Sequence, residues 1–403
     1  MIVSDGSKPL TGLRVLELAR VLAGPWAGQT LADLGANVIK VERPEGGDET
    51  RTWGPPFIPG ENGEPSAAYF HAANRGKKSV AIGFETPAGR EAVIALAKNA
   101  DVVIENFKVG GLAKYGLDYA AIKAINPRVI YCSITGFGQT GPYASRAGYD
   151  FIVQGMGGIM DLTGAPDGEP QKTGVAFADI FAGLYATIGI LAALNARNTT
   201  GQGAHIDMAL LDAQVSVLAN QAMNYLASGK PPRRLGNAHP NIVPYQVFAS
   251  ADRPIIIAAG NDGQFARVCE VLGLAGLERD ARFDTNARRV ANRAELIPII
   301  EAETAKRPSD ELLAGLEAAG VPAGPVNRVD QAFADPQVIA RGMYQELARE
   351  DGTAVPSVRG PIVMNGEPCV AATPSPDLGA HTGDVLDLVA QGQDPWAAFE
   401  REG

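Results

Sequence analysis

Short aliphatic runs alternate with helical segments near the start of the chain, and this alternation constrains the fold most. Leu13 to Leu18 and Asn37 to Glu42 read as strands, and Ala23 to Leu34 between them has the spacing of a helix. Two strands joined through a helix run parallel, because the connection crosses over the sheet. The pattern therefore predicts a β-α-β unit within a parallel sheet that has helices on both faces.

The same alternation continues to residue 134. Strands are predicted at Val80 to Phe84, Val102 to Glu105 and Val129 to Ile134. A helix is predicted from Thr86, with Pro87 in its first turn, where a proline removes no helical hydrogen bond. Repetition of the unit predicts a sheet of several parallel strands, in the manner of a Rossmann-like domain.

The character of the sequence changes after residue 228. Residues 179–228 are predicted to be mostly helical, with a polar, glycine-rich turn at 198–203, and 229–244 resembles a linker because it holds four prolines. Tyr245 to Phe248 and Ile255 to Ala258 then read as a hairpin, followed by helices. A final helix is expected near Val385.

These patterns define the expected domains. The fold class is α/β, with a large parallel-sheet domain formed by both chain ends and a smaller α+β domain. Residues 1–228 are predicted to be the N-terminal part of the large domain, and 229–330 the small domain with its linker. Residues 331–403 are predicted to return to the large domain.

Composition excludes several classes of partner. The 403 residues carry a formal net charge of -10, with no block of lysines and arginines, so a nucleic-acid partner is not expected. No uncharged apolar run of about 18 residues occurs, and the first ten residues lack the basic and apolar regions of a signal peptide. We therefore expect a soluble, cytoplasmic protein without a membrane partner.

Metal and disulfide chemistry have little support. Cys132, Cys269 and Cys369 have neither disulfide-framework nor metal-ligand spacing, and the four histidines are scattered. We expect three buried thiols, no metal site and no permanently bound cofactor.

The first predicted β-α turn, Val21 to Gly28, is a candidate ligand site, because helix amides at the carboxyl edge of a parallel sheet attract phosphate. The glycine spacing differs from GxGxxG, although Glu42 stands where a ribose-binding acid would be. A nicotinamide-dependent dehydrogenase is therefore disfavoured, and a plain structural turn is the simpler interpretation of these residues alone.

Several basic residues lie near predicted strand ends. Arg43 follows the second strand, Lys77 and Lys78 precede the third, and Lys108 and Lys114 follow the fourth. Each alone could be a solvated surface charge. Together, at one edge of a sheet, they would form a site for the phosphates of a nucleotide-like ligand.

Asp179 is an ionisable residue within an apolar run, Val175 to Leu184. A buried carboxylate is paired, caps a helix or is retained for function. Helix capping and catalysis are both consistent with its place at a predicted helix start. As a nucleophile it would lose hydration by burial, while helix amides would keep it ionised.

Taken together, the motifs resemble the class III CoA-transferase family of the CaiB/BaiF type, which includes formyl-CoA transferase and carnitine CoA-transferase. The likeness spans nearly the whole chain, and the order of the motifs makes it specific. The motifs are Arg14 to Leu18, Ala23 to Pro25, Leu34 to Glu42, Asn74 to Ser79, Glu105 to Phe107, Ala178 with Asp179, Thr200 to Gly203, and Leu378 to Thr382.

The resemblance implies a catalytic role for Asp179 as the nucleophile. It also implies contacts with coenzyme A (CoA) along the sheet edge. These contacts fall on Val21, Leu22, Ala23, Arg43, Ile82, Gly83, Phe84, Glu85, Asn106, Phe107, Lys108, Lys114, Thr135, Gly136, Phe137 and Gly138. One departure is Leu22, where formyl-CoA transferase has an active-site glutamine, and this puts a formyl or oxalyl substrate in doubt.

The implied enzyme moves CoA from an acyl-CoA donor to a small carboxylic acid through an anhydride and an aspartyl-CoA thioester. The resemblance also implies an interlocked homodimer of two threaded rings. Gly236 to Asn241 is our candidate for the backbone donors that face the tetrahedral oxyanion.

Residues within the linker and just after it suggest the donor. Gly236 to Tyr245 and Ala259 to Phe265 look like the branch that contains succinate-hydroxymethylglutarate CoA-transferase, so succinyl-CoA or another dicarboxylyl-CoA is expected. Arg233 and Arg234 could hold a distal carboxylate by two parallel hydrogen bonds, with His239 as another donor. The alternative is that both arginines are solvated linker residues.

Two other functions remain open. An α-methylacyl-CoA racemase would share the fold but remove an α-proton with an acid/base pair, and racemases of this family have a histidine where this chain has Tyr149. A tyrosine there leaves the proton relay without one partner. A non-catalytic CoA-binding protein would leave Asp179 without a purpose.

Overall fold

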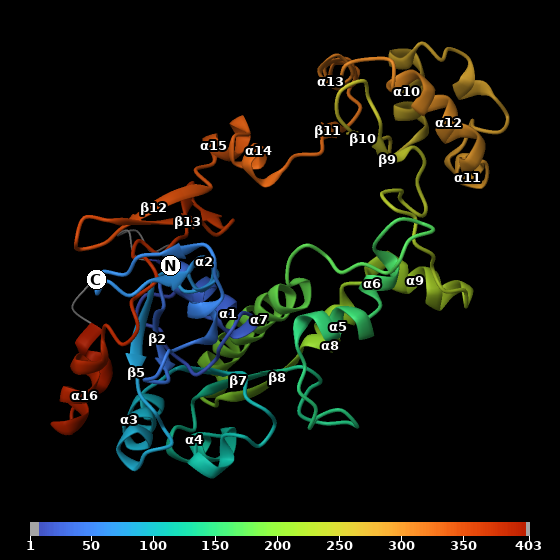
Figure 1. Ribbon diagram of the computed structural model, residues 1–403. Helices are drawn as coiled ribbons and strands as arrows, with labels where there is room; N and C mark the ends of the chain where they lie inside the picture. The colour runs from blue at the N-terminus through green and yellow to red at the C-terminus, as the bar shows by residue number, and fades with distance from the viewer. Residues whose placement is uncertain (1–7, 400–403) are drawn as a thin grey trace. The chain divides into compact units, whose positions relative to one another are not determined.

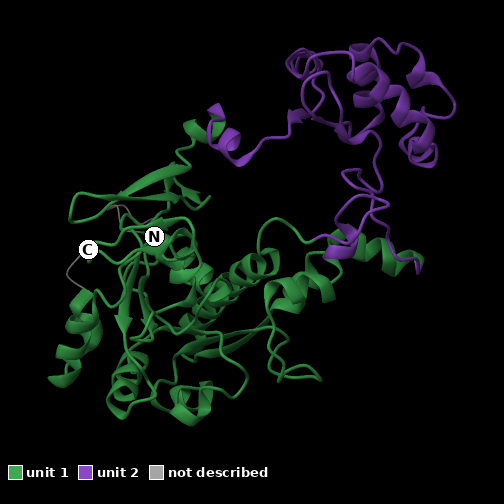
Figure 2. Ribbon diagram, viewed as in Figure 1, with its two compact units in different colours: residues 1–159, 172–228, 337–403 green, residues 160–171, 229–336 purple. Residues whose placement is uncertain are grey.

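The computed structural model describes residues 8–399, which form two compact units. The large unit comprises residues 1–159, 172–228 and 337–403, and the small unit comprises 160–171 and 229–336 (Figure 2). The large unit thus contains described residues from both the N-terminal and the C-terminal parts of the chain. Two details differ from the boundaries expected from sequence: residues 160–171 belong to the small unit, and the last boundary lies at 336/337 instead of 330/331.

A six-stranded parallel sheet organises the large unit, in the order β5-β2-β1-β6-β7-β8. Figure 1 labels β2, β5, β7 and β8 of this sheet. The order reverses between β1 and β6, and ligands bind at such a switch point. This confirms the predicted α/β class. The strands are β1 (Arg14–Glu17), β2 (Asn37–Glu42), β5 (Lys77–Ala81), β6 (Val102–Glu105), β7 (Ile130–Thr135) and β8 (Ala204–Ala209).

Alternate residues of each strand face two separate cores, because side chains point to opposite faces of a sheet. Val15 and Ile104 face a core with α1 (Ala23–Asp33) and α7 (Phe177–Thr200). Leu16 and Val103 face the other core, which is covered by helices. Those helices include α3 (Pro87–Lys98), α4 (Tyr119–Ile125) and α16 (Thr382–Ala390).

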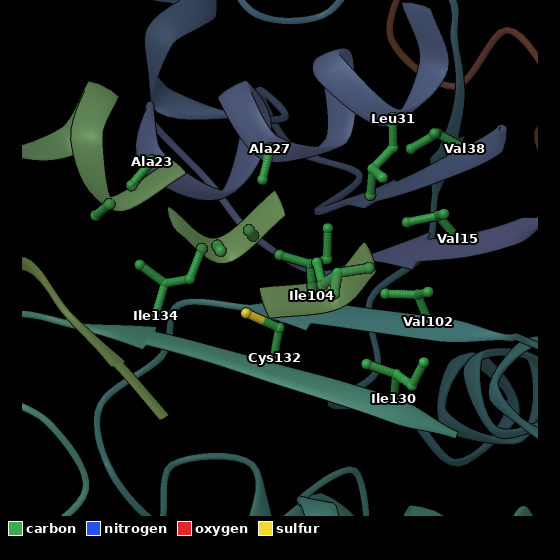
Figure 3. Packing of buried hydrophobic residues seen from close by; sticks show 14 of the residues in the cluster. Val15, Ala23, Ala27, Leu31, Val38, Val102, Ile104, Ile130, Cys132 and Ile134 are labelled. Atoms are coloured by element: carbon green, nitrogen blue, oxygen red, sulfur yellow. The ribbon is translucent and has the colours of Figure 1, made fainter. Parts of the chain in front are cut away.

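Small residues allow α1 and α7 to approach each other on the first face. Figure 3 shows Ala23, Ala27 and Leu31 of α1 above the sheet. A Cβ at Gly183 of α7 would lie 2.7 Å from the backbone oxygen of Ala23, which is closer than real side chains come. Glycine at this position therefore places the start of α7 directly beside the start of α1.

Among residues 8–399, α7 is also the one helix that is long and apolar enough to span a membrane by length and composition. Core helices pass the same test. The side chains of Ala182, Ala186 and Ile190 are buried in the core of the large unit, so one face of this helix packs inside the protein, while 33% of its apolar stretch is buried in the single chain.

The small unit has its own core around a three-stranded antiparallel sheet, which includes the predicted hairpin. The strands are β9 (Tyr245–Phe248), β10 (Ile255–Ala258) and β11 (Ala323–Pro325). The main helices are α10 (Asp262–Leu272), α11 (Asn286–Ala291), α12 (Arg293–Thr304), α13 (Ser309–Ala318) and α14 (Val329–Phe333).

Shorter elements complete both units. Up to residue 228 they are η1 (Glu49–Thr52), β3 (Phe57–Ile58), β4 (Ser66–Ala67), α2 (Ala68–His71), η2 (Ala113–Tyr115), α5 (Asp150–Met156), α6 (Ile159–Leu162), α8 (Leu210–Ser216) and α9 (Ala219–Ser228). After residue 228 they are η3 (Leu277–Arg279), α15 (Pro336–Ala340), β12 (Tyr344–Ala348), β13 (Ala354–Val358), β14 (Val363–Met364), β15 (Glu367–Pro368) and η4 (Pro395–Phe399).

Hydrogen bonds fix the C-terminal segment to the large unit. The backbone N–H of Gly379 donates to the hydroxyl of Ser79 at 2.9 Å, and Ala81 N–H donates to the Thr382 hydroxyl at 2.9 Å. Trp396 is fully buried and donates from its indole nitrogen to the Leu96 carbonyl at 3.0 Å. The last residues therefore complete the core around α3.

Two strand predictions were wrong for physical reasons. β5 begins at Lys77 instead of Val80, because the Lys77 side chain is buried and its charge is fully bonded, so it does not mark the surface. β8 lies where a turn and a helix were expected. It is an edge strand in which polar residues such as His205 and Asp207 alternate with apolar ones. Strands were predicted from aliphatic runs, so this one was not recognised.

Candidate active site

The turn between β1 and α1 has an unusual backbone. Val21 has φ of 67°, in the left-handed region that β-branched residues avoid. Both peptide groups that flank Arg20 are bonded to Asn106: the Arg20 N–H donates to Asn106 Oδ1 at 2.9 Å, and Asn106 Nδ2 donates to the Arg20 carbonyl at 2.7 Å. The turns that follow β1 and β6 are thus joined at the carboxyl edge of the sheet.

A cavity of about 440 Å³ opens at this edge, at the switch point between β1 and β6. Asp179 lines this cavity, whose volume suits a small-molecule ligand. Its position there does not by itself decide between helix capping and catalysis. Many of the other expected CoA contacts line the same cavity. These are Val21, Leu22, Ala23, Asn106, Phe107, Lys108, Thr135 and Gly136.

Asp179 does not cap its helix. It is the third residue of α7, and its carboxylate accepts no hydrogen bond from the residues that the structure describes. The capping acceptor is Asp150 of α5, whose Oδ1 accepts from Ala178 N–H at 2.8 Å and from Asp179 N–H at 3.4 Å. Asp150 is held in turn by Gln154 Nε2 at 2.7 Å. This removes the capping interpretation of Asp179.

The electrostatic environment of Asp179 differs from the expectation that helix amides keep it ionised. Burial, and then the negative charge of Asp150, raise its pKa from 3.8 to about 7. The amides at the start of α7 are satisfied by Asp150, so they do not lower it. Tyr69 is close enough that Asp179, after burial, helps raise the tyrosine pKa. Asp179 is thus a carboxyl group poised near neutral pH.

A second cavity, of about 180 Å³, shares Arg20 and Phe107 with the first. Four further predicted CoA contacts line it: Arg43, Ile82, Phe84 and Glu85. The Phe107 ring lies edge-on to Phe84 with centroids 5.8 Å apart. The two cavities together run along one edge of the sheet, as an elongated nucleotide-like ligand requires.

The remaining predicted contacts do not line either cavity. Gly83 lies between two residues that do, while Lys114 is exposed with its ammonium 4.6 Å from the Tyr115 ring. Phe137 and Gly138 follow β7, and the Gly138 N–H donates to Thr135 Oγ1 at 2.9 Å. Their proposed contacts stay predictions.

Lys77 corrects the idea that all of these cations gather at an anion site. Its ammonium is buried and donates to Glu17 Oε1 at 3.0 Å, to the Pro25 carbonyl at 2.9 Å and to Asn74 Oδ1 at 2.8 Å. It lies at the start of β5, so it is at the other end of the strand from the ligand edge. The Lys77 charge is therefore neutralised by buried acceptors and does not contribute to an anion site.

A buried charge cluster lies beneath the β1–α1 turn, and it is defined by Glu17, Lys40, Asp48 and Lys77. Lys40 Nζ lies 3.0 Å from Glu17 Oε1 and 2.9 Å from Asp48 Oδ2, with no exposed side-chain surface on any of the three. Burial alone would lower the Lys40 pKa, but the carboxylates of Asp48 and Glu17 raise it. A Cβ at Gly28 would lie 1.8 Å from Glu17, so only glycine leaves room for the cluster under α1.

Sequence reasoning missed three residues of the site. Asp150 caps the helix of Asp179, Asp48 bonds the Val21 N–H, and Arg146 lines the larger cavity, with its guanidinium 4.5 Å from the Tyr143 ring. No helix was predicted at Asp150, so no signal in the sequence pointed to this residue. Nothing in the spacing connects Asp48 with Val21.

The small unit holds the other candidates. Arg234 donates to Asp161 Oδ1 at 3.0 Å and to the Gly168 carbonyl at 2.9 Å, so its guanidinium is engaged within that unit, while Arg233 is exposed. His239 Nδ1 accepts from Asn241 N–H at 3.1 Å. The expected oxyanion role of 236–241 stays a prediction.

Fold and site together define a class. A doubly wound parallel sheet holds an elongated pair of cavities at its switch point, and one wall carries a desolvated carboxyl group without a partner among residues 8–399. An α/β enzyme that acts on a nucleotide-like ligand by carboxylate chemistry has this construction.

The particular family follows from comparison: residues 10–382 match CoA-transferase family III, and the chain belongs to that family. It is 59% identical over 379 residues to succinate–glutarate CoA-transferase of Agrobacterium fabrum, covering 94% of this chain and 95% of the relative. It is 44% identical to human succinyl-CoA:glutarate CoA-transferase, covering 96% and 87%.

A solved structure agrees with both assignments. The crystal structure of a CaiB/BaiF family protein from Brucella suis has a TM-score of 0.84 and 61% identity, covering 96% of this chain and 99% of that one. The expected family and fold are confirmed, and the chain is a class III CoA-transferase that uses CoA thioesters as substrates.

Proposed function

We propose that this enzyme transfers CoA between dicarboxylic acids by covalent catalysis at Asp179. The observation that carries the proposal is the carboxyl group itself, which lines a 440 Å³ cavity beside the expected CoA contacts and accepts no hydrogen bond within residues 8–399. A carboxylate that is neither capping nor paired is available as a nucleophile.

The reaction needs four acyl transfers. An oxygen of the Asp179 carboxylate attacks the thioester carbon of the donor, and the C–S bond breaks to release CoA thiolate and form a mixed anhydride. The thiolate then attacks the Asp179 carbonyl carbon, which forms aspartyl-CoA and frees the donor acid. The acceptor carboxylate enters, and the two steps run in reverse. No net proton is taken up or lost.

The raised pKa of Asp179, and the burial that causes it, are both consistent with this exchange. At a pKa of about 7 the group is ionised in a useful fraction of molecules near neutral pH. Burial, its main cause, also removes the hydration that weakens a carboxylate as a nucleophile. The same burial would protect the anhydride from water.

CoA would lie along the two cavities. We assign the acyl group and the pantetheine arm to the larger cavity with Asp179, and the adenine end to the smaller one with Arg43 and Ile82. Lys108, which lines the larger cavity and has no bonding partner within the described chain, would contact the phosphates. Lys114, outside both cavities, would act only at longer range. No cofactor is proposed to be bound permanently.

The proposed donor is succinyl-CoA, with a dicarboxylic acid such as glutarate as the acceptor. The names of the Agrobacterium and human relatives support this choice, at 59% and 44% identity. Leu22 in the cavity wall agrees, because a leucine gives no hydrogen bond to a formyl or oxalyl group. Of the two arginines expected to bind the distal carboxylate, Arg233 is the better candidate, because Arg234 is already paired with Asp161.

An interlocked homodimer is also part of the proposal. Apolar side chains of adjacent helices in the large unit are exposed in the single chain, which suits burial against a second copy. They include Phe151 and Met156 of α5 and Tyr185 and Ile188 of α7, with Ile188 59% exposed. Sedimentation at nanomolar concentration tests this, because a folded monomer would contradict it. A cytoplasmic location stays a prediction.

Intact-protein mass after mixing with succinyl-CoA, acetyl-CoA or formyl-CoA tests the covalent step and the donor together. We expect an added mass of CoA in the wild type with succinyl-CoA, its absence in Asp179→Asn, and loss of the adduct on borohydride treatment. Transfer by Asp179→Asn at a near-normal rate would overturn the nucleophile. Equal or faster transfer from acetyl-CoA would overturn the dicarboxylate preference.

A further inference from the structure

The strained residue in the β1–α1 turn requires an explanation. Among the non-glycine residues within 8–399, φ lies in the left-handed region only at Val21, Ala219 and Asn365. Val21 is the β-branched one of these, and it lines the cavity that contains Asp179. Such a conformation persists only where surrounding contacts impose it, and it occurs most often at functional sites.

Asp48 supplies the imposing contact. The Val21 N–H donates to both carboxylate oxygens, at 3.1 Å to Oδ2 and 3.3 Å to Oδ1. Asp48 lies 27 residues farther along the chain, in the segment after β2, so the contact is not local. The same peptide group has its carbonyl on Arg20, which accepts from Asn106 Nδ2 at 2.7 Å, so Asn106 holds the carbonyl end of this peptide and Asp48 holds its N–H end.

Asp48 is itself fixed on every side. Its Oδ1 accepts from Thr50 N–H at 3.0 Å and the Thr50 hydroxyl at 2.8 Å, and its Oδ2 lies 2.9 Å from Lys40 Nζ. Its own N–H donates to Glu42 Oε2 at 3.0 Å. Asp48 as a whole residue is 1% exposed. An acceptor this rigid can hold a neighbouring peptide in a strained conformation.

We propose that Asp48 is a positioning residue for CoA transfer, which acts through the Val21 peptide to keep Val21, Leu22 and Ala23 in the shape that receives the thioester end of CoA. The inference rests on the proposed CoA-binding role of this turn. Lys40 contributes by keeping the Asp48 carboxylate ionised and in place. Without Asp48, Val21 would relax to negative φ and the wall of the cavity would move.

Substitution of Val21 by glycine separates this role from plain structural support. Glycine adopts φ near 67° without steric cost, so it needs no acceptor to hold the turn. We would measure kcat/KM for succinyl-CoA in the wild type, Asp48→Ala, Val21→Gly and the double variant. Asp48→Ala should lower kcat/KM roughly 10- to 100-fold when residue 21 is valine. The same change in the Val21→Gly background should cost less than about 3-fold.

Asp33→Ala is the matched control. Asp33 is buried at the other end of α1 and is paired with Arg75, and it accepts from Ala371 N–H at 2.9 Å. Its loss should lower the unfolding temperature as Asp48→Ala does, yet change kcat/KM by less than about 2-fold. Equal losses in kcat/KM for the two variants would show that Asp48 gives only general stability.

The outcomes are distinguishable. Losses from Asp48→Ala that are equal in the valine and glycine backgrounds overturn the inference. If Asp48→Ala does not fold, Asp48→Asn takes its place in the same cycle, because one amide oxygen remains to accept a hydrogen bond. The wild type with succinyl-CoA is run alongside: if it transfers no CoA, the proposed donor fails, whereas a working wild type with an unaffected Asp48→Ala counts against Asp48 alone.

Discussion

Two sets of charged side chains meet at the β1–α1 turn, and they differ in whether they are paired. In the buried cluster, Asp48 is bonded to Lys40 and its pKa is lowered, although burial alone would raise it. At the cavity wall, Asp179 forms no ion pair with any residue in 8–399, and burial with the charge of Asp150 raises its pKa to about 7. Burial raises the pKa of both carboxyl groups, so the charge of the neighbouring residue decides whether the pKa ends above or below its ordinary value.

The comparison shows that this fold holds some charged side chains in internal ion pairs and leaves others unpaired at the cavity wall. Charges that are paired inside are bonded to one another and stabilise the turn. Asp179 and Lys108 line the cavity and have no ion pair within the chain as described, so their charges remain available to substrate. The first three predictions below each remove one charge from one of the two sets, and the fourth removes the charge next to Asp179.

The largest expected effect is on the paired set. Lys40→Met should lower the free energy of unfolding by about 3–5 kcal/mol, because it leaves the Glu17 and Asp48 carboxylates buried without their shared cation. Urea titration monitored by circular dichroism would measure it. Lys98→Met, at an exposed position in the last turn of α3, should change stability by less than about 0.5 kcal/mol. A similar small change for Lys40→Met would show that the cluster is dispensable.

The unpaired carboxyl group should behave in the opposite way. The pKa of Asp179 is about 7 in the folded chain and 3.8 without the fold, so ionising it costs stability as the pH rises from about 4 to 7. Asp179→Asn should therefore stabilise the protein at pH 8 by on the order of 1–2 kcal/mol, with partial exposure screening the rest. The gain should vanish near pH 4. Thermal unfolding at both pH values tests this, and destabilisation at pH 8 would contradict it.

A smaller effect is expected for the unpaired cation. Lys108→Gln should weaken CoA binding about 5- to 10-fold at low salt, because Lys108 lines the cavity. Lys114→Gln should have a weaker effect, since Lys114 is exposed and outside both cavities. Direct calorimetric titration with CoA measures both. Identical affinities for the two variants and the wild type would make both lysines ordinary surface charges.

The smallest effect concerns the neighbour of Asp179. Asp150→Asn keeps an oxygen that can cap α7 but removes the negative charge, so the pKa of Asp179 should fall. The acid limb of kcat/KM against pH should move down by roughly half to one pH unit. Asp150→Ala should lose helix stability as well, about 1 kcal/mol. An unmoved acid limb in Asp150→Asn would show that burial alone sets the Asp179 pKa.

The sequence predicted most of the sheet because its strands are aliphatic. β2 and β6 have the predicted bounds, and Thr86 caps α3, accepting from Gly89 N–H at 3.1 Å. The prediction was wrong where polar residues enter the fold. Lys77 begins β5 with a buried charge, and the alternating residues of β8 lie at the sheet edge.

Within the site, motifs predicted the position of the carboxyl group but not its surroundings. Asp179 and the turn at Val21 were found because they belong to recognisable segments. The Asp150 contact spans 29 residues and the Asp48 contact 27, and neither follows a helical or strand period. Such contacts depend on how the sheet brings loops together, which local spacing does not encode.

The return of the C-terminal segment has a consequence for synthesis. The hydrogen-bond partners of the Ser79 hydroxyl and the Leu96 carbonyl are Gly379 and Trp396, which leave the ribosome about 300 residues later. Residues 229–336 emerge before those partners, so the small unit can acquire its own core while the large one is still incomplete. A nascent chain stalled so that residue 337 has just left the ribosome should therefore hold a protease-resistant small unit and an open α3 face.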